Sequence, residues 1–190
     1  TALRLADLAL RAGGCEVLAE LDTTPLPTEE LALALFPEEL RGLAAEIDAH
    51  LVEGVTALLE QRPGSAESDE LLTACRRLLV RVAQLDDAVL RRKASTRNTA
   101  AAVVSIIARG NDLMGYSPAP LHEKNLRRAF DLRSAPSQRA RSLKEAAALP
   151  HRYTGIALAD PGLLLGTMRA KLLQEQDALT SHRTAKRPNR

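Results

Sequence analysis

Apolar residues recur every three or four positions along much of this chain, which is the spacing of amphipathic helices. The segment 71–89 is the clearest case, because its apolar positions step by four, three, four, three and four: Leu71, Cys75, Leu78, Val82, Leu85 and Val89. A second stripe covers 37–61, with Pro37 at the first helical position. These two patterns predict two long helices, and Pro63 and Gly64 end the one over 37–61.

The segment 100–108 differs from these stripes because it is apolar on every side. A helix without a polar face belongs in the middle of a bundle, where other helices cover it all round. The polar run 95–99 before it predicts a break or a kink, with a continuous helix as the alternative, and Gly110 with Asn111 supplies a stop. We therefore expect a central helix at about 95–109.

Helices are also expected at both ends of the chain. The predicted segments are 2–21 with an interruption at Gly13-Gly14, 28–35 capped by Thr28, 120–132, 137–149, and a final helix that opens at Asp160-Pro161. Only four residues are aromatic, so Leu, Ala, Val and Ile must build the core. This composition favours helices over strands. The predicted fold class is all-α, a multi-helix bundle with short connections.

The chain reads as one helical domain over 1–180, followed by a basic tail over 181–190. No stretch has the roughly 18 consecutive apolar residues of a transmembrane helix, and charges interrupt the first apolar run, so we expect no membrane partner and a cytoplasmic location. Cys15 and Cys75 lie in apolar settings, which indicates two buried, reduced thiols.

Charge is distributed very unevenly between the two parts of the domain. Residues 1–75 hold 15 acidic and 4 basic side chains, whereas residues 76–190 hold 9 acidic and 22 basic ones. Such asymmetry favours a polyanionic partner for the basic part, nucleic acid above all or an acidic protein. The candidate polyanion-binding residues are Arg91, Arg92, Lys93, Arg97, Lys124, Arg127, Arg128, Arg133, Arg139, Arg141 and Lys144. The alternative is that the acidic helices simply pack beside the basic ones, within one molecule or across a homodimer.

Candidate chemistry is sparse. The sequence contains no phosphate-binding loop, nucleophile elbow or spaced set of metal ligands, so we predict no catalytic residue, no metal and no cofactor. A candidate small-molecule pocket is formed by the polar residues at the two ends of the central helix: Arg97, Asn98, Asn111 and His122. The sequence leaves open whether the chain is an enzyme, and the absence of these motifs favours a non-enzymatic protein.

Three functional hypotheses follow. The first is a non-enzymatic regulator or accessory subunit that binds nucleic acid or another polyanion through its Arg-rich face. The second is a protein-interaction or oligomerisation module that buries the seam at 71–89 and a stripe at 165–179 against a partner chain. The third is an all-helical enzyme or sensor that holds a small anionic ligand near Arg97.

Overall fold

The computed structural model describes residues 2–59, 67–115, 121–152 and 155–185, and these residues form helices and connections without a β-strand. The α-helices are α1 (Ala2–Ala12), α2 (Cys15–Ala19), α3 (Arg41–Leu59), α4 (Glu67–Asp86), α5 (Ala88–Arg91), α6 (Thr96–Gly110), α7 (Glu123–Ala129), α8 (Ser137–Ala146) and α9 (Gly166–Ala185). Three single 3₁₀ turns accompany them: η1 (Leu33–Leu35), η2 (Glu38–Leu40) and η3 (Pro161–Leu163). The predicted all-α bundle is confirmed.

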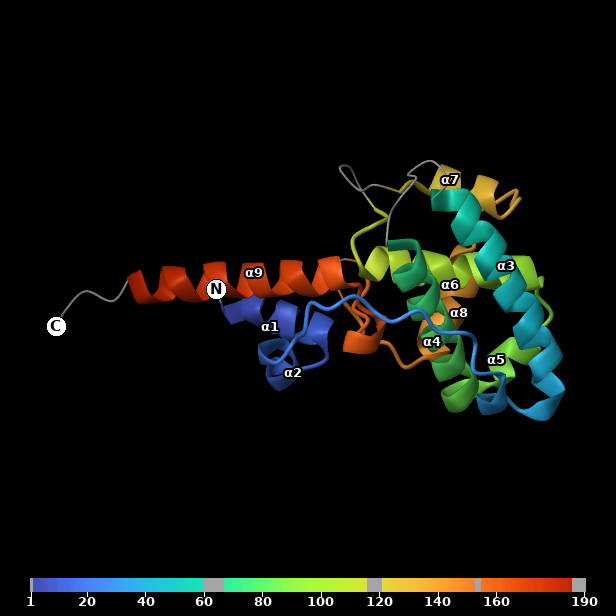
Figure 1. Cartoon of the computed structure of the whole chain (residues 1–190), viewed down its shortest axis with the longest axis horizontal. Helices are drawn as coiled ribbons and strands as arrows, with labels where there is room; N and C mark the ends of the chain where they lie inside the picture. Colours follow the sequence, from blue (N-terminus) through green and yellow to red (C-terminus); the bar gives the residue numbers. More distant parts are fainter. Residues whose placement is uncertain (1, 60–66, 116–120, 153–154, 186–190) are drawn as a thin grey trace.

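Helices α3 to α8 gather into one body, and α9 projects from it with α1 and α2 lying along its first part (Figure 1). Helix α6 occupies the centre of the body, where it packs against α3, α4, α7 and α8. All nine residues of 100–108 are buried, as their apolar character predicted. Three consecutive alanines, at 100–102, let the neighbouring helices approach closely.

Helix α6 begins and ends at polar caps. Ser95 is the N-cap, and its hydroxyl accepts a hydrogen bond from the backbone N–H of Asn98 at 3.1 Å. The helix break lies at 92–95, because α5 ends at Arg91 and α6 starts at Thr96, so the predicted break falls just before most of the polar run 95–99. At the other end Asn111 is the C-cap and Gly110 the last helical residue, so the helix stops at the predicted Gly110-Asn111 pair.

The helix predicted over 28–35 is wrong, since only η1 forms there. The reason lies in α4, whose side chains bind the backbone of this segment. The guanidinium of Arg76 takes the carbonyl of Glu29, which a helix would use internally. The N–H of Glu29 donates to the hydroxyl of Thr73 at 3.2 Å, and that hydroxyl donates to the carbonyl of Pro27 at 2.9 Å. Just upstream, the N–H of Leu26 donates to buried Glu70 at 2.9 Å. These contacts hold the segment in an irregular conformation along α4.

The last helix begins later than the sequence suggests. Asp160 caps only the turn η3, where its carboxylate accepts from the N–H of Gly162 at 2.8 Å. Helix α9 starts at Gly166, whose N–H donates to Glu70 at 2.8 Å. It continues to Ala185, so the first residues of the expected tail are helical, and 186–190 lie outside the described residues.

The apolar seam of 71–89 packs inside the chain. Leu71, Cys75, Leu78 and Val82 are fully buried, and Val89 follows in α5 after a break at Asp87. Leu85 is the exception, with 57% of its surface exposed. In the predicted stripe 165–179, Leu165 just before α9 and Met168 and Leu172 within it are also buried in the core.

Several expected boundaries and settings are corrected. The helices predicted at 120–132 and 137–149 are shorter, and a residue with positive φ follows each of them closely, Asp131 and Ala148. Cys75 is buried as expected, but Cys15 is exposed because it opens the short helix α2. The predicted end of α3 near Gln61 falls outside the described residues. In the described part of the chain, no helix combines the length and apolar character that crossing a bilayer requires.

Candidate functional site

Ion pairs join the acidic first part of the chain to the basic second part. Arg76 in α4 binds Asp48 of α3 through two hydrogen bonds, at 2.7 and 3.0 Å. Arg152 likewise donates two hydrogen bonds to Asp7 of α1, both at 2.7 Å. Arg77 also forms a two-pronged pair, with Glu29. Part of the charge asymmetry is therefore neutralised within the molecule, as the alternative reading expected.

Only two of the eleven candidate polyanion-binding residues share in this neutralisation. Arg91 lies 2.7 Å from Glu39 and 2.8 Å from Asp87. Arg97 has two distant carboxylates, Glu53 at 3.9 Å and Asp131 at 3.7 Å. The other nine form no ion pair with any residue that the structure describes. The segment 88–151 as a whole holds twelve Lys and Arg against four Asp and Glu.

Five of these basic residues gather around the amino-terminal end of α6, and we call them the α6 cluster: Arg92, Lys93, Arg97, Arg133 and Arg139. Arg92 and Lys93 belong to the exposed link between α5 and α6, and Arg97 lies in the first turn of α6. The connection from α7 to α8 passes the same end of α6.

Two contacts locate that connection. Near its start, Asp131 lies beside Arg97. Just after it, the guanidinium of Arg139 donates to the hydroxyl of Thr99 in α6 at 3.0 Å. Arg133 lies between these two anchors. The exposed amino end of a helix carries partial positive charge, so the cluster adds side-chain charge to the α6 dipole.

The remaining candidates lie elsewhere. Lys124 and Arg128 are exposed on α7, and Arg127 is half-buried, with one hydrogen bond to the carbonyl of Arg133 at 3.4 Å. Arg141 and Lys144 border a hollow of about 380 Å³ at the far end of α8, together with Arg152. Arg139 is not a surface residue, because only 8% of it is exposed.

The four residues of the candidate pocket do not come together. Asn98 and Asn111 lie at opposite ends of α6, which are about 20 Å apart at 1.5 Å per residue. Asn111 is buried, and its amide donates to the carbonyls of Ile107 and Leu163 and accepts from the N–H of Leu165. His122 is exposed at the start of α7. Its neighbour in sequence, Glu123, pairs with Arg109 at 3.0 Å.

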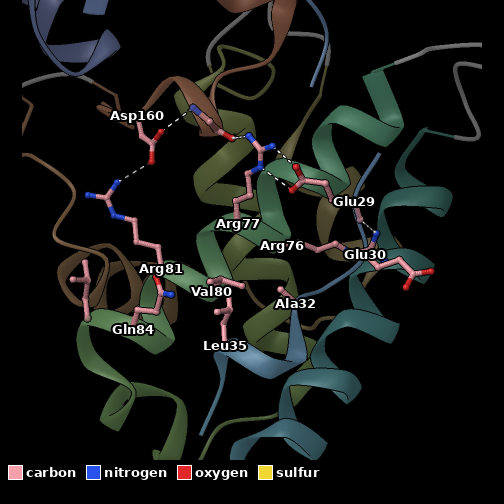
Figure 2. A pocket seen from close by; sticks show the side chains of 12 residues that line it. Glu29, Glu30, Ala32, Leu35, Arg76, Arg77, Val80, Arg81, Gln84 and Asp160 are labelled. Carbon is pink, nitrogen blue, oxygen red and sulfur yellow. Dashed lines mark hydrogen bonds and ion pairs between the residues drawn. The ribbon is translucent and has the colours of Figure 1, made fainter. Parts of the chain in front are cut away.

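The structure instead forms a groove of about 640 Å³ between α4, the segment 29–35 and the turn η3 (Figure 2). One wall is apolar and consists of Ala32, Leu35 and Val80. The opposite rim is a polar chain in which Arg81 reaches Asp160, and Gly162 joins Asp160 to Arg77.

The charges that line this groove balance closely. Arg77 is held by Glu29, and this contact lowers the pKa of Glu29 and raises the pKa of Arg77. Arg81 also donates to the carbonyl of Ala147 at 2.8 Å, besides its longer contact with Asp160 at 3.4 Å. Glu30 is the remaining carboxylate of the groove, and it is exposed. The groove therefore suits a ligand with an apolar body and little net charge better than a polyanion.

Sequence reasoning missed this groove, although its arginines were visible at 76–81. The signal that could have located it was the i, i+4 spacing of Arg77 and Arg81, which places both on one face of α4. The partners Glu29 and Asp160 are 48 and 79 positions from them, and no local pattern connects such distant residues.

No cluster of three or more metal-ligating side chains exists among the described residues. The chain matches no family model, and comparisons with curated proteins and with solved structures give no significant match.

Proposed function

We propose that this protein binds a nucleic-acid backbone or a similar polyanion through the α6 cluster and the neighbouring exposed cations of α7. The observation that carries the proposal is the unequal pairing of the arginines. Arg76, Arg77 and Arg81 on α4 and Arg152 after α8 have carboxylate partners. In contrast, these basic residues are exposed and form no ion pair with any described residue: Arg92, Lys93, Lys124, Arg128 and Arg133. Uncompensated cations on one part of a surface attract phosphate groups and release counter-ions when they bind them.

The arrangement favours contacts to phosphates over contacts to bases. Stacking on single-stranded bases needs exposed aromatic rings. Phe36 and Phe130 are both buried, and Tyr116 and Tyr153 lie outside the described residues. The Arg guanidinium can form two parallel hydrogen bonds to a phosphate, which suits recognition of a backbone without reading of its sequence.

The interaction-module alternative loses much of its support. Its seam at 71–89 is mostly buried within the chain, and so are the first three side chains of the α9 stripe. A helix face that already packs inside its own molecule is not free to pair with another chain. The exposed Leu85 is an isolated position of that seam.

Fluorescence anisotropy of a labelled duplex, measured across a salt series, tests the proposal. Four to six phosphate contacts should give a slope of about −4 to −5 for the logarithm of the binding constant against the logarithm of salt concentration. Reversing two exposed cations of the α6 cluster, in Lys93→Glu/Arg133→Glu, should weaken binding at least about tenfold and make this slope shallower.

The matched control reverses two exposed arginines outside the cluster, in Arg4→Glu/Arg41→Glu on α1 and α3. It changes the net charge by the same amount, so it separates a local surface from a general charge effect. Equal losses in the two double variants would contradict a localised site, and no binding by the unaltered protein at low salt would reject the function.

A further inference from the structure

Arg139 carries a buried charge without an ion pair among the described residues. Only 8% of this residue is exposed, and its hydrogen bonds go to neutral acceptors. Its Nε donates to the hydroxyl of Thr99 at 3.0 Å, and its Nη1 donates to the carbonyl of Val89 at 2.9 Å. No carboxylate of the described residues lies within ion-pair distance of it. A cation removed from water without a counter-ion is energetically costly.

The neighbouring charge of Arg92 increases the cost of burying Arg139. Burial, followed by repulsion from Arg92, lowers the pKa of Arg139 below the usual value for arginine. The amino end of α6 adds further positive potential, since Thr99 is only one turn from the N-cap Ser95. Two guanidinium groups and a helix end thus place positive charge together. The carboxylates at this end of α6 contact other residues: Glu46 accepts from the hydroxyl of Thr96 at 2.8 Å, and Glu53 and Asp131 lie 3.9 and 3.7 Å from Arg97.

One nitrogen of Arg139 remains available for a ligand. Nη2 has no hydrogen-bond partner among the described residues, yet it is not among the side-chain atoms sealed from solvent. The other two nitrogens fix the plane of the guanidinium group, so Nη2 is held on a rigid support. Exposed Arg92 can approach the same point from the α5–α6 link.

We propose that Arg139 and Arg92 form the subsite for one phosphate group, with Arg139 as its fixed part and Arg92 as its mobile part. This inference rests on the proposed function, because it names the point at which a backbone phosphate would be anchored. A phosphate offers several oxygen acceptors and the negative charge that Arg139 and Arg92 lack as a partner, and two guanidinium groups can share it. An inorganic phosphate ion carries the same chemistry, which allows the subsite to be tested without nucleic acid.

The experiment has two arms on the full chain. In the first, the unfolding temperature is followed with increasing inorganic phosphate while sodium chloride is adjusted to keep ionic strength constant. A ligand of the folded state raises this temperature, and the rise should saturate in the unaltered protein and in Arg4→Gln. The rise should disappear in Arg139→Gln, and Arg92→Gln should bind phosphate about tenfold more weakly.

The second arm repeats the duplex titration with the same variants. The loss of one phosphate contact should make the salt slope shallower by about 0.9. Arg139 is buried, so Arg139→Gln can unfold the protein. Arg92→Gln therefore tests the subsite at an exposed residue. Arg139→Lys keeps the positive charge but removes the planar guanidinium group.

The outcomes separate the two proposals. Phosphate binding that depends on Arg92 supports the subsite even where duplex binding is absent, in which case the proposed function fails alone. Duplex binding whose slope is unchanged in Arg92→Gln and Arg139→Lys, with no saturating effect of phosphate, overturns the subsite and leaves the function standing. Absence of both effects removes both proposals.

Discussion

The ring of Phe130 lies directly against the backbone of Gly54 in α3, where a Cβ atom would be 2.1 Å from Cζ of the ring. Phe130 is the residue that ends α7, and only 1% of it is exposed. This contact sets the position of α7 on α3, and α7 carries Lys124 and Arg128. A residue without a side chain therefore determines where part of the basic surface lies.

The first prediction concerns this contact. Gly54→Ala should lower the free energy of unfolding by about 2–3 kcal/mol, because the added methyl group must displace a packed ring. Gly42→Ala in the same helix is the matched control, since no atom lies within 4 Å of the position of its Cβ. It should leave stability unchanged or raise it by up to about 1 kcal/mol. Urea unfolding of both variants measures the difference, and equal effects would disprove the packing argument.

The second prediction concerns Asn111, which joins the end of α6 to the turn before α9. Its buried amide forms hydrogen bonds with Ile107, Leu163 and Leu165, each between 2.8 and 3.0 Å. Asn111→Ala should cost about 2–4 kcal/mol, because the carbonyl of Leu163 and the N–H of Leu165 lose their buried partner, whereas Ile107 keeps the bond from the backbone N–H of residue 111. Asn111→Asp should cost at least as much, since a carboxylate cannot donate to the two carbonyls. Denaturant unfolding checks this, and losses below about 0.5 kcal/mol would mean that water replaces the amide.

The third prediction is a pH dependence that arises from Asp7 and Arg152. Their two-pronged hydrogen bond holds the pKa of Asp7 below its usual value, partly offset by burial. A carboxyl whose folded pKa is lowered stabilises the fold above its unfolded pKa of about 3.9, and the stabilisation is lost as pH falls through the lower folded value. Asp7 is partly exposed, so solvent screening limits the contribution to about 0.5–1 kcal/mol.

The difference in stability between the unaltered protein and Asp7→Asn measures this contribution. It should be constant above about pH 5 and should vanish towards about pH 2. In a double-mutant cycle with Arg152→Met, the coupling energy should show the same pH profile. A coupling that persists unchanged into acid would show that the two residues interact through packing instead of charge.

The fourth prediction concerns the two thiols. Cys75 has no exposed surface, and burial is the main cause that raises its pKa far above that of a free thiol, whereas Cys15 is exposed. Because the thiolate is the reactive form, a thiol reagent at pH 8 should label Cys15 rapidly and Cys75 only on unfolding. Mass spectrometry of the labelled protein should find one adduct under native conditions and two in denaturant. A Cys15→Ser variant then reports the opening of the core through Cys75 alone, and its rapid native labelling would contradict the burial.

Local patterns in the sequence were enough to locate most helices. The all-round apolar character of 100–108 predicted the central helix, and the seam of 71–82 predicted the core face of α4. Candidate N-cap residues predicted the starts of helices less well. Ser95 acts as a local cap, whereas Thr28 and Asp160 failed to start the expected helices because α4 and Asn111 engage the backbone near them.

The sequence by itself determined the helical class, the central helix and the uneven distribution of charge, since each depends on residues close together in the chain. Only the tertiary structure decided which cations are neutralised. Arg76 and Arg77 find acidic partners 28 and 48 positions away, while Arg92 and Arg133 find none among the described residues. The burial of Arg139 was likewise decided by tertiary packing. Coulomb attraction and desolvation depend on distances in space, and these distances are set by how the helices pack.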